Sequence, residues 1–452
     1  MRTLALGARR QRGGQVGLAS AGAAPLAATA RQKRGRHLRS HGPARPATIS
    51  TLTVLLGAAA LAAPGCAAKA EWAGTIEERD GVVYVTNLAE PLWASPVGSA
   101  DGAESQPLGF ELEQVYGVES EPAEAILGSV RMWTVDDDQN VYVLDPSVHR
   151  IIAFAADGSV RWAAGRAGEG PGDLAGYLGL ATDGHSTLFV LNQAGTRVDR
   201  WSLAGDYLGG NSLDAFGFAR LEGLTFAPPN HLITRRRRSV RDTDLNEIAS
   251  EYSVLVMDDP WRLDPEIIIR AEPPVSTPVP SPLGIDTRFL ADRILAGNSG
   301  GYVLRAFDRD GTLVRQVTRP FDGLLPPGFH ITQRPGGATG VAIYLYGDLS
   351  APLPLPSGHW LAYVWWEPGI DDPEAEATRR TEANERFDES AYHHAIDLFD
   401  PEGRFLYSWT GEGGRFPEIG NPERIGADGR LYTTLNDPYP QVRRYRVEIE
   451  ER

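Results

Sequence analysis

Residues 139–174 read QNVYVLDPSVHRIIAFAADGSVRWAAGRAGEGPGDL, in which apolar stretches alternate with turn residues. Such short apolar runs bounded by D-P or D-G predict strands joined as hairpins. The last ten residues, 165–174, hold four glycines and could instead wrap a phosphate. A P-loop needs Lys and then Ser or Thr after its last glycine, whereas Asp173 follows Gly172 here. The dinucleotide fingerprint fails too, because its third glycine falls on Asp173. We therefore predict a sharp connection between strands.

The strand–turn–strand pattern of this stretch returns along the chain. Copies lie at 149–160, 196–208, 252–260, 302–314, 394–406 and 441–450. Aligning them on the residue before the turn gives the register residues Phe154, Trp201, Met257, Phe307, Phe399 and Tyr445. A second pattern, turn then strand, precedes several copies, at 136–145, 183–192 and 427–436. Four short strands in a unit of about 45–50 residues predict a propeller blade.

The spacing of the copies predicts six blades with long insertions between strands. The widest gap, from Phe307 to Phe399, contains one more set of strands and the acidic segment 367–390, which we expect to be an insertion with a short helix. A seventh blade in this gap is the alternative. We expect loop excursions at 235–250 and 271–290.

Ring closure needs the two ends of the chain to meet in one sheet. The last copy ends near Glu448 with no strand after it. We predict that GVVYVTN, residues 81–87, closes the ring by pairing with strands in 424–448, because an open ring would expose sheet edges.

Charge divides the chain at Cys66. Residues 1–65 contain ten Arg or Lys and no acidic residue, whereas the remainder carries 34 basic and 59 acidic residues, a formal charge of −25. Nucleic acid and anionic headgroups require matched positive charge, so this acidic surface disfavours them as partners.

The N-terminus has the parts of an export signal. A basic region precedes TISTLTVLLGAAALAAPGC, whose apolar run suits a signal peptide and is short for a membrane span. Cys66, the only cysteine, follows this run and cannot form an internal disulfide. The arrangement resembles a bacterial lipobox, which implies lipidation at Cys66, although Ala63 and Pro64 depart from the usual residues. Secretion with plain cleavage and an uncleaved anchor are the alternatives.

A wider resemblance covers roughly residues 80–450. The run QNVYVLDPSVHRIIAFAADGSVRWAAGRAGEGPGDL, with GVVYVTNLAEPLW upstream, is similar to the first blades of bacterial six-bladed, NHL-repeat-like propeller lipoproteins. Asp173 replaces the usual Glu, and the third blade, with Arg235–Arg238, is degenerate. The resemblance implies that GRAGEGPGDL leads from the first blade to the second.

Several residues could carry a metal or other chemistry. Scattered histidines could converge on the axis of a propeller, as in NHL-type lyases, although none has a zinc-site spacing; they are His149, His185, His231, His330, His359, His393 and His394. Lactonase-type propellers hold calcium with carboxylate and amide oxygens. The corresponding candidates are Glu90, Asn192, Asn298 and Asn436.

Two other motifs have a functional and a structural interpretation. Arg235–Arg238 could clamp an anion, but alternate side chains of a strand point to opposite faces, so a solvated edge or hairpin is favoured. Trp365 and Trp366 should lie on opposite faces of a strand, where one could stack on a sugar and packing between sheets explains the other. No G-x-S-x-G occurs.

These observations predict an all-β chain: residues 1–65 as a basic extension and signal peptide, 66–80 as a linker after a lipidated Cys66, and 81–452 as a six-bladed β-propeller. We expect an exported, lipid-anchored monomer in the cell envelope, facing the periplasm or cell surface, that binds an envelope protein, peptide or saccharide. Neither a cofactor nor nucleic acid is expected. The alternative is a metal-dependent enzyme, an NHL-type lyase or lactonase-like hydrolase with calcium or zinc in the central channel.

Overall fold

The computed structural model describes most of the chain after residue 70. The described residues are 71–93, 106–117, 126–213, 220–227, 231–242, 247–257, 266–270, 285–290, 292–298, 301–326, 328–333, 339–383, 385, 391–410, 419–436 and 438–450. All belong to one compact unit, residues 67–452. Within these ranges, no helix is both long and apolar enough to cross a bilayer.

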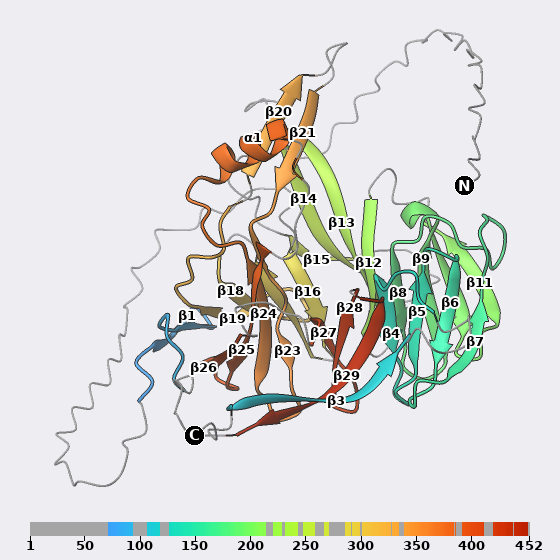
Figure 1. Ribbon diagram of the computed structural model, residues 1–452, viewed down its shortest axis with the longest axis horizontal. Coiled ribbons are helices and arrows are strands. Elements are labelled where there is room, and N and C mark those ends of the chain that lie inside the picture. The colour runs from blue at the N-terminus through green and yellow to red at the C-terminus, as the bar shows by residue number, and fades with distance from the viewer. Residues whose placement is uncertain are drawn as a thin grey trace, which may run out of the picture. The chain divides into compact units, whose positions relative to one another are not determined.

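Six sheets of at least four strands follow one another along the chain as blades 1 to 6 (Figure 1). Blade 1 comprises β4 (Met132–Val135), β5 (Val141–Asp145), β6 (Arg150–Phe154) and β7 (Val160–Ala164). Blade 2 comprises β8 (Gly179–Thr182), β9 (Thr187–Asn192), β10 (Arg197–Ser202) and β11 (Tyr207–Ser212). Blade 3 comprises β12 (Arg220–Ala227), β13 (His231–Asp242), β14 (Glu247–Met257) and β15 (Glu266–Arg270).

The second half of the chain supplies the other three blades. Blade 4 contains β16 (Ile285–Phe289), β17 (Arg293–Asn298), β18 (Val303–Asp308) and β19 (Leu313–Thr318). Blade 5 contains β22 (Gly347–Leu349), β23 (Leu353–Pro354), β24 (Trp360–Trp366), β25 (His393–Phe399) and β26 (Phe405–Trp409). Blade 6 contains β27 (Asn421–Ile425), β28 (Leu431–Leu435), β29 (Gln441–Ile449) and β3 (Leu108–Tyr116). The predicted six-bladed β-propeller is confirmed. Each register residue lies in the third strand of its sheet, counted from the inner edge; in blade 5, where β22 and β23 both pair with β24, that strand is β25.

The hydrophobic core lies between neighbouring blades. Buried side chains form five clusters in the described part of the chain, which join blades 1 and 2, 2 and 3, 4 and 5, 5 and 6, and 6 and 1. The last of these joins places Tyr432 of β28 beside Trp133 of β4, with ring centroids 6.0 Å apart. A sheet that lies between two neighbouring sheets buries both of its faces. The strands of a blade can therefore carry apolar residues on both faces.

The ring is closed by a different strand from the predicted one. β3 pairs with β29 over Leu108–Tyr116 and completes blade 6. β2 (Val82–Thr86), which contains most of the predicted closing segment, instead runs parallel to β19 on the outside of blade 4. Segment 108–116 does alternate from Leu108 to Glu113, and this strand signal was overlooked because the segment stands outside the repeated copies.

The segment before β3 is also part of the fold, contrary to the prediction that residues 66–80 are a linker that adds nothing to a blade. β1 (Thr75–Arg79) pairs with β2, and the indole of Trp72 donates to the side chain of Asn87. Leu92 and Trp93 then donate backbone hydrogen bonds along β26. The chain therefore covers the outer edges of blades 4, 5 and 6 in turn.

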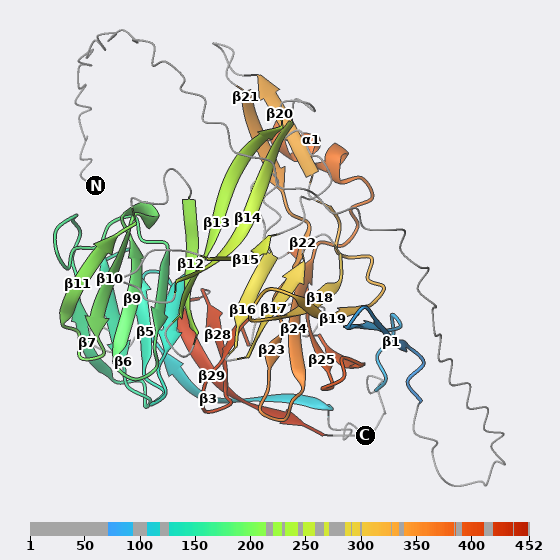
Figure 2. The ribbon, with the colours of Figure 1, turned by 180° about the vertical axis from the view of Figure 1, so that it is seen from behind.

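The insertions all extend from the same end of the blades. In each blade the second-to-third-strand turn and the connection to the next blade lie at one end, because successive strands are antiparallel. At this end lie the tip of the β13–β14 hairpin, the hairpin of β20 (Gly328–Gln333) and β21 (Thr339–Tyr344), and α1 (Pro373–Ala383). Figures 1 and 2 show these elements projecting beyond the upper ends of the strands. We call this the extended end.

Two predicted insertions need correction or refinement. Residues 235–250, expected to be a loop, are mostly strand, because β13 and β14 pair as far as Asp242 and Glu247. Of segment 271–290, residues 285–289 form β16, and 271–284 lie outside the described residues. The helix expected in 367–390 is α1. The described part of the widest gap contains a two-stranded sheet, β20–β21, in addition to blade 5.

Candidate functional site

Residues of three innermost strands meet at the axis of the propeller. β4, β16 and β27 each form the inner edge of their sheet, in blades 1, 4 and 6. Arg288 of β16 donates from Nη1 to the carbonyl of Glu423 of β27, at 2.5 Å. Blade 5 separates blades 4 and 6 around the ring, so this contact joins the inner strands of two blades that are not neighbours. We call Trp133, Thr134, Arg288, Glu423, Arg424 and Thr434 the axial cluster.

Glu423 is aimed by a β-bulge. The register of β27 against β28 shifts between Pro422 and Arg424, which leaves Glu423 as the extra residue. Its carboxylate accepts hydrogen bonds from Nε1 of Trp133 at 2.6 Å and from the hydroxyl of Thr434 at 2.5 Å. Burial raises the pKa of Glu423. The hydrogen bonds from the two neutral donors, Thr434 and Trp133, offset part of this rise.

Arg424 brings a positive charge to the same place. Its Nη1 donates to the hydroxyl of Thr134 at 2.9 Å, and its guanidinium carbon lies 5.7 Å from the centre of the Trp133 ring. Burial and the nearby charge of Arg288 lower the pKa of Arg424 to about 10. The axial cluster thus combines two guanidinium groups, one carboxylate and an indole, a combination suited to binding a polar or anionic group.

The glycine-rich segment 165–174 is the connection from blade 1 to blade 2, as predicted. The loop closes around a carboxylate of its own: Asp173 accepts from the backbone N–H of Gly170 at 3.0 Å and from Arg166 at 2.6 Å. The Arg166 hydrogen bond holds the pKa of Asp173 below its usual range. The loop therefore does enclose an anion, but that anion is supplied by the chain.

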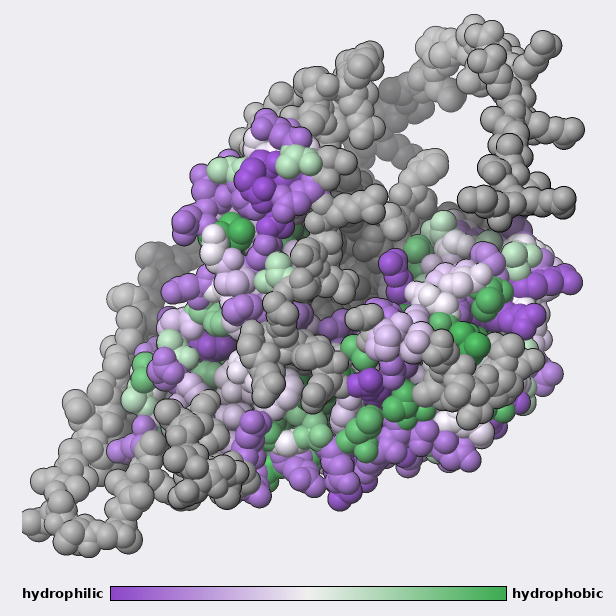
Figure 3. Space-filling model, in the orientation of Figure 1, coloured by the Kyte–Doolittle hydropathy of each residue, from purple (hydrophilic) through white to green (hydrophobic). Residues whose placement is uncertain are grey.

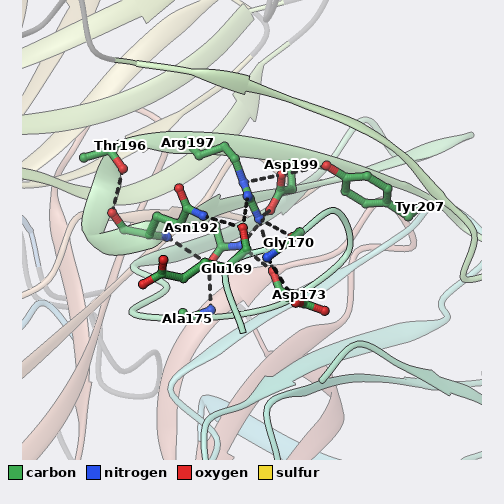
Figure 4. Close-up of polar contacts among 10 residues, drawn as sticks. Glu169, Gly170, Asp173, Ala175, Asn192, Thr196, Arg197, Asp199 and Tyr207 are labelled. Carbon is green, nitrogen blue, oxygen red and sulfur yellow. Dashed lines mark hydrogen bonds and ion pairs between the residues drawn. The ribbon is translucent and has the colours of Figure 1, made fainter. Parts of the chain in front are cut away.

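A buried framework in blade 2 holds the carbonyls of this loop (Figure 4). Arg197 donates to the carbonyls of Glu169 and Asp173 and pairs with Asp199, which is fully buried. Asn192 donates to the Asp173 carbonyl and to Asp199, at 2.9 and 2.6 Å. Because buried polar groups need partners, this framework fixes the loop against blade 2.

The histidines considered as possible metal ligands are spread over the molecule. His185 pairs with Asp137 at 2.8 Å in exposed turns, and His330 contacts Thr378 of α1. His359 contacts Ser357, and the backbone of His149 has a positive φ of 52°. His393 lies edge-on to Trp366 and His394 bonds to Tyr363, on opposite faces of blade 5. The side chain of His231, in β13, is outside the described ones.

The calcium candidates whose side chains are described do not meet either. Asn192 is buried in the loop framework, whereas Glu90 and Asn436 are exposed in separate connections. The side chain of Asn298, at the end of β17, is not among the described ones. Over the described residues, no group of three or more His, Cys, Asp or Glu side chains is placed to hold a metal ion.

Arg235–Arg238 lie in β13 and belong to the long hairpin. Arg235, Arg236 and Arg237 are paired with both β12 and β14, and Arg238 is paired with β14 alone. Trp365 and Trp366 do lie on opposite faces of β24. Trp365 packs against the cluster between blades 5 and 6, and Trp366 against that between blades 4 and 5. Cys66 and residues 1–65 lie outside the described residues.

Sequence reasoning missed the axial cluster, although the repeat contained a signal for it. Leu290 and Gly426 each begin the turn after an innermost strand, and Arg288 and Arg424 each stand two residues earlier. Thr134 has the same place before Asp136 in blade 1. Aligning the copies on this inner turn, rather than on the outer one, would have grouped these residues.

No protein-family model matches this sequence, and no curated protein matches it. A solved structure that it resembles is a member of the DUF4221 family from Bacteroides vulgatus ATCC 8482, with 9% identity, 76% of this chain and 99% of that chain covered, and a TM-score of 0.50. Another, from Bacteroides fragilis NCTC 9343, is named as an exported protein: 9% identity, 81% and 100% covered, TM-score 0.47. A calcium-binding protein, regucalcin, from Agrobacterium tumefaciens C58 has 12% identity, 76% and 96% covered, and a TM-score of 0.39. At such identities the likeness concerns the fold alone.

Proposed function

We propose that this protein is an exported, lipid-anchored binding module of the cell envelope, whose extended end recognises an envelope protein, peptide or saccharide. The observation that carries the proposal is the placement of the insertions. The β13–β14 tip, the β20–β21 hairpin and α1 all extend from the end of the blades that also bears the inter-blade connections. Loops held by a rigid scaffold are where binding sites are usually built.

Specific side-chain contacts hold the insertions at the extended end in place. α1 packs on β20, where His330 contacts Thr378, and Arg380 of α1 forms a buried ion pair with Glu367. The outer face of α1 is strongly hydrophilic, as Figure 3 shows. A preorganised polar surface suits a hydrated partner, because little entropy is lost when rigid elements bind.

A photocrosslinking experiment in intact cells tests which end binds. A photoreactive amino acid replaces Glu374 or Glu382, exposed on α1, and in matched controls Asp310 or Glu402, exposed in turns at the opposite end. We expect adducts from the α1 positions only. Sedimentation with isolated peptidoglycan sacculi provides the saccharide arm. Equal adducts from both ends, or adducts from the short turns alone, would refute the proposal.

The metal-dependent enzyme remains the alternative, and it makes a separate prediction. Purified protein would retain stoichiometric calcium or zinc, and its removal would abolish turnover of a lactone or peptidyl substrate. Elemental analysis of the purified chain decides between the two.

A further inference from the structure

Among the described residues, Arg424 of the axial cluster forms no ion pair, although the charge of the nearby Glu423 acts on it. Its one hydrogen bond within the described chain goes to the neutral hydroxyl of Thr134, and its flat face lies toward the Trp133 ring. The adjacent Glu423 accepts from Trp133 and Thr434 instead. Arg424 is half-buried as a residue.

A second guanidinium lies close by. Arg288 reaches the Glu423 carbonyl from blade 4, two blades away around the ring, and is half-buried as well. The repulsion between the two arginines contributes to the lowered pKa of Arg424, after burial. The Glu423 carboxylate attracts both guanidinium groups, but a single carboxylate offsets only one of the two positive charges, so the axial cluster keeps a formal charge of +1.

We propose that the axial cluster binds an oxyanion, the carboxylate or phosphate group of a small ligand, between Arg424 and Arg288. This site is at the axis and goes beyond the proposed recognition at the extended end. Guanidinium groups bind both kinds of oxyanion through two parallel hydrogen bonds. The rest of the body is strongly acidic, so attraction for an anion must come from local charge rather than from the whole surface.

A purely structural role for Arg424 makes the opposite prediction about stability. If Arg424 only held blade 6 to blade 1, its replacement would lower the melting temperature in every buffer. If it forms an anion site, Arg424→Gln removes a poorly compensated charge and can still donate to Thr134. The variant should then melt at the wild-type temperature or above it when no oxyanion is present.

The test uses the purified full chain at low ionic strength, with calorimetric titration and melting curves in acetate, inorganic phosphate and sulfate. We expect saturable binding of at least one anion, and the acetate and phosphate arms identify the preferred group. Arg424→Gln should weaken that binding by about tenfold or more. Arg424→Lys keeps the charge without the two-pronged geometry and should bind more weakly than wild type.

Exposed Arg79→Gln is the matched control, because it removes one positive charge from the outer surface. It also reports the general stabilisation that sulfate and phosphate give any protein. The absence of saturable binding by the wild type would overturn the proposal. So would unchanged binding in Arg424→Gln, or destabilisation of both Arg424 variants without a change in affinity.

Discussion

At the residue scale, the loop that contains Gly168 shows how a chain can occupy its own anion cradle. Asp173 fills the turn of segment 165–174, and its carboxylate lies where an added Cβ on Gly168 would be, 2.3 Å from Oδ2. Gly168 has φ of 155°, a conformation that other residues avoid. The glycine is therefore required twice, for its backbone angle and for the close approach of a side chain.

Gly168→Ala separates these two requirements when it is compared with Gly301→Ala. Gly301 has nearly the same φ, 158°, but no atom lies within 4 Å of its Cβ position. We expect both variants to lose stability through backbone strain, and Gly168→Ala to lose about 1–3 kcal/mol more, because Asp173 must move. Urea unfolding of both variants measures the difference. Equal losses would show that the Asp173 contact is unimportant.

His394 predicts a pH dependence of stability. Burial, with a smaller effect of His393, lowers the pKa of His394 to about 4, below its usual value near 6.5. Above pH about 6.5 the histidine is neutral in both states and imposes no penalty. As the pH falls below 6.5, the unfolded chain gains the proton first, so stability is lost.

The change His394→Gln should flatten that pH dependence. Between pH about 7 and 5, we expect the wild type to lose about 1–2 kcal/mol more than the variant, a value reduced because the ring is partly exposed. Denaturant unfolding at several pH values measures this. His359→Gln, at an exposed turn, is the control. Parallel pH profiles for the wild type and His394→Gln would contradict the prediction.

At the element scale, the repeat is a bulged hairpin. In five blades the third strand shifts register by one residue immediately before its register residue, Phe154, Trp201, Phe307, Phe399 or Tyr445. In the first four of these, a five-residue turn with a positive-φ glycine follows. A bulge increases local twist, which turns the outer strand across the blade. This explains why an aromatic residue and a downstream glycine recur together.

The N-terminal strands β1 and β2 add to blade 4, whereas β3 completes blade 6. Truncated chains should therefore show different effects on stability when they lack β1 and β2 alone or β3 as well. A chain that begins at residue 106 lacks β1 and β2 but keeps β3. Because blade 4 already has four strands without β2, we expect this chain to fold with a lower melting temperature. A chain that begins at residue 118 lacks β3, so blade 6 loses its outer strand and Tyr116 no longer packs on Phe154. We expect it to lose cooperative unfolding.

A synthetic peptide of residues 106–117 provides the control for the second truncation. If β3 acts by completing the sheet, adding the peptide should restore the near-ultraviolet circular dichroism of the folded protein. Cooperative unfolding of the shorter chain without the peptide would show that ring closure does not depend on β3.

At the scale of the whole molecule, the two ends of the propeller differ in structure. Short turns close one end, and every described insertion extends from the other. The strands at the axis contribute the axial cluster, and the segment from Trp72 to Tyr116 covers three outer edges. This segment pairs with the edges of β19 and β29 and leaves β1 and β3 as the outer strands of their sheets.

Membrane attachment is a prediction that concerns the molecule as a whole. If Cys66 is lipidated and acylated at its amino group, the several chains together give stable anchoring, which one chain alone does not. We expect the native protein in membrane and detergent fractions, and Cys66→Ser in the soluble fraction with unchanged circular dichroism. Mass spectrometry of the mature N-terminus checks the modification. An unmodified Cys66, or cleavage elsewhere, would refute lipidation.

The sequence by itself determined the number of blades, the third strand of each, and the role of segment 165–174. These features depend on local chemistry: alternating apolar residues, a turn with a glycine, and spacing along the chain. The helix of the 367–390 insertion was also predicted. All of these signals are contained within one hairpin or one connection.

Only the tertiary structure decided which strand closes the ring and which residues meet at the axis. β3 pairs with β29 across more than three hundred residues, and no pattern within one hairpin shows which distant strand is its partner. Arg288 and Arg424 stand at equivalent places in two copies but come together only when the inner strands of blades 4 and 6 meet around the axis. A contact of this kind has no local pattern, since closure of the ring creates it.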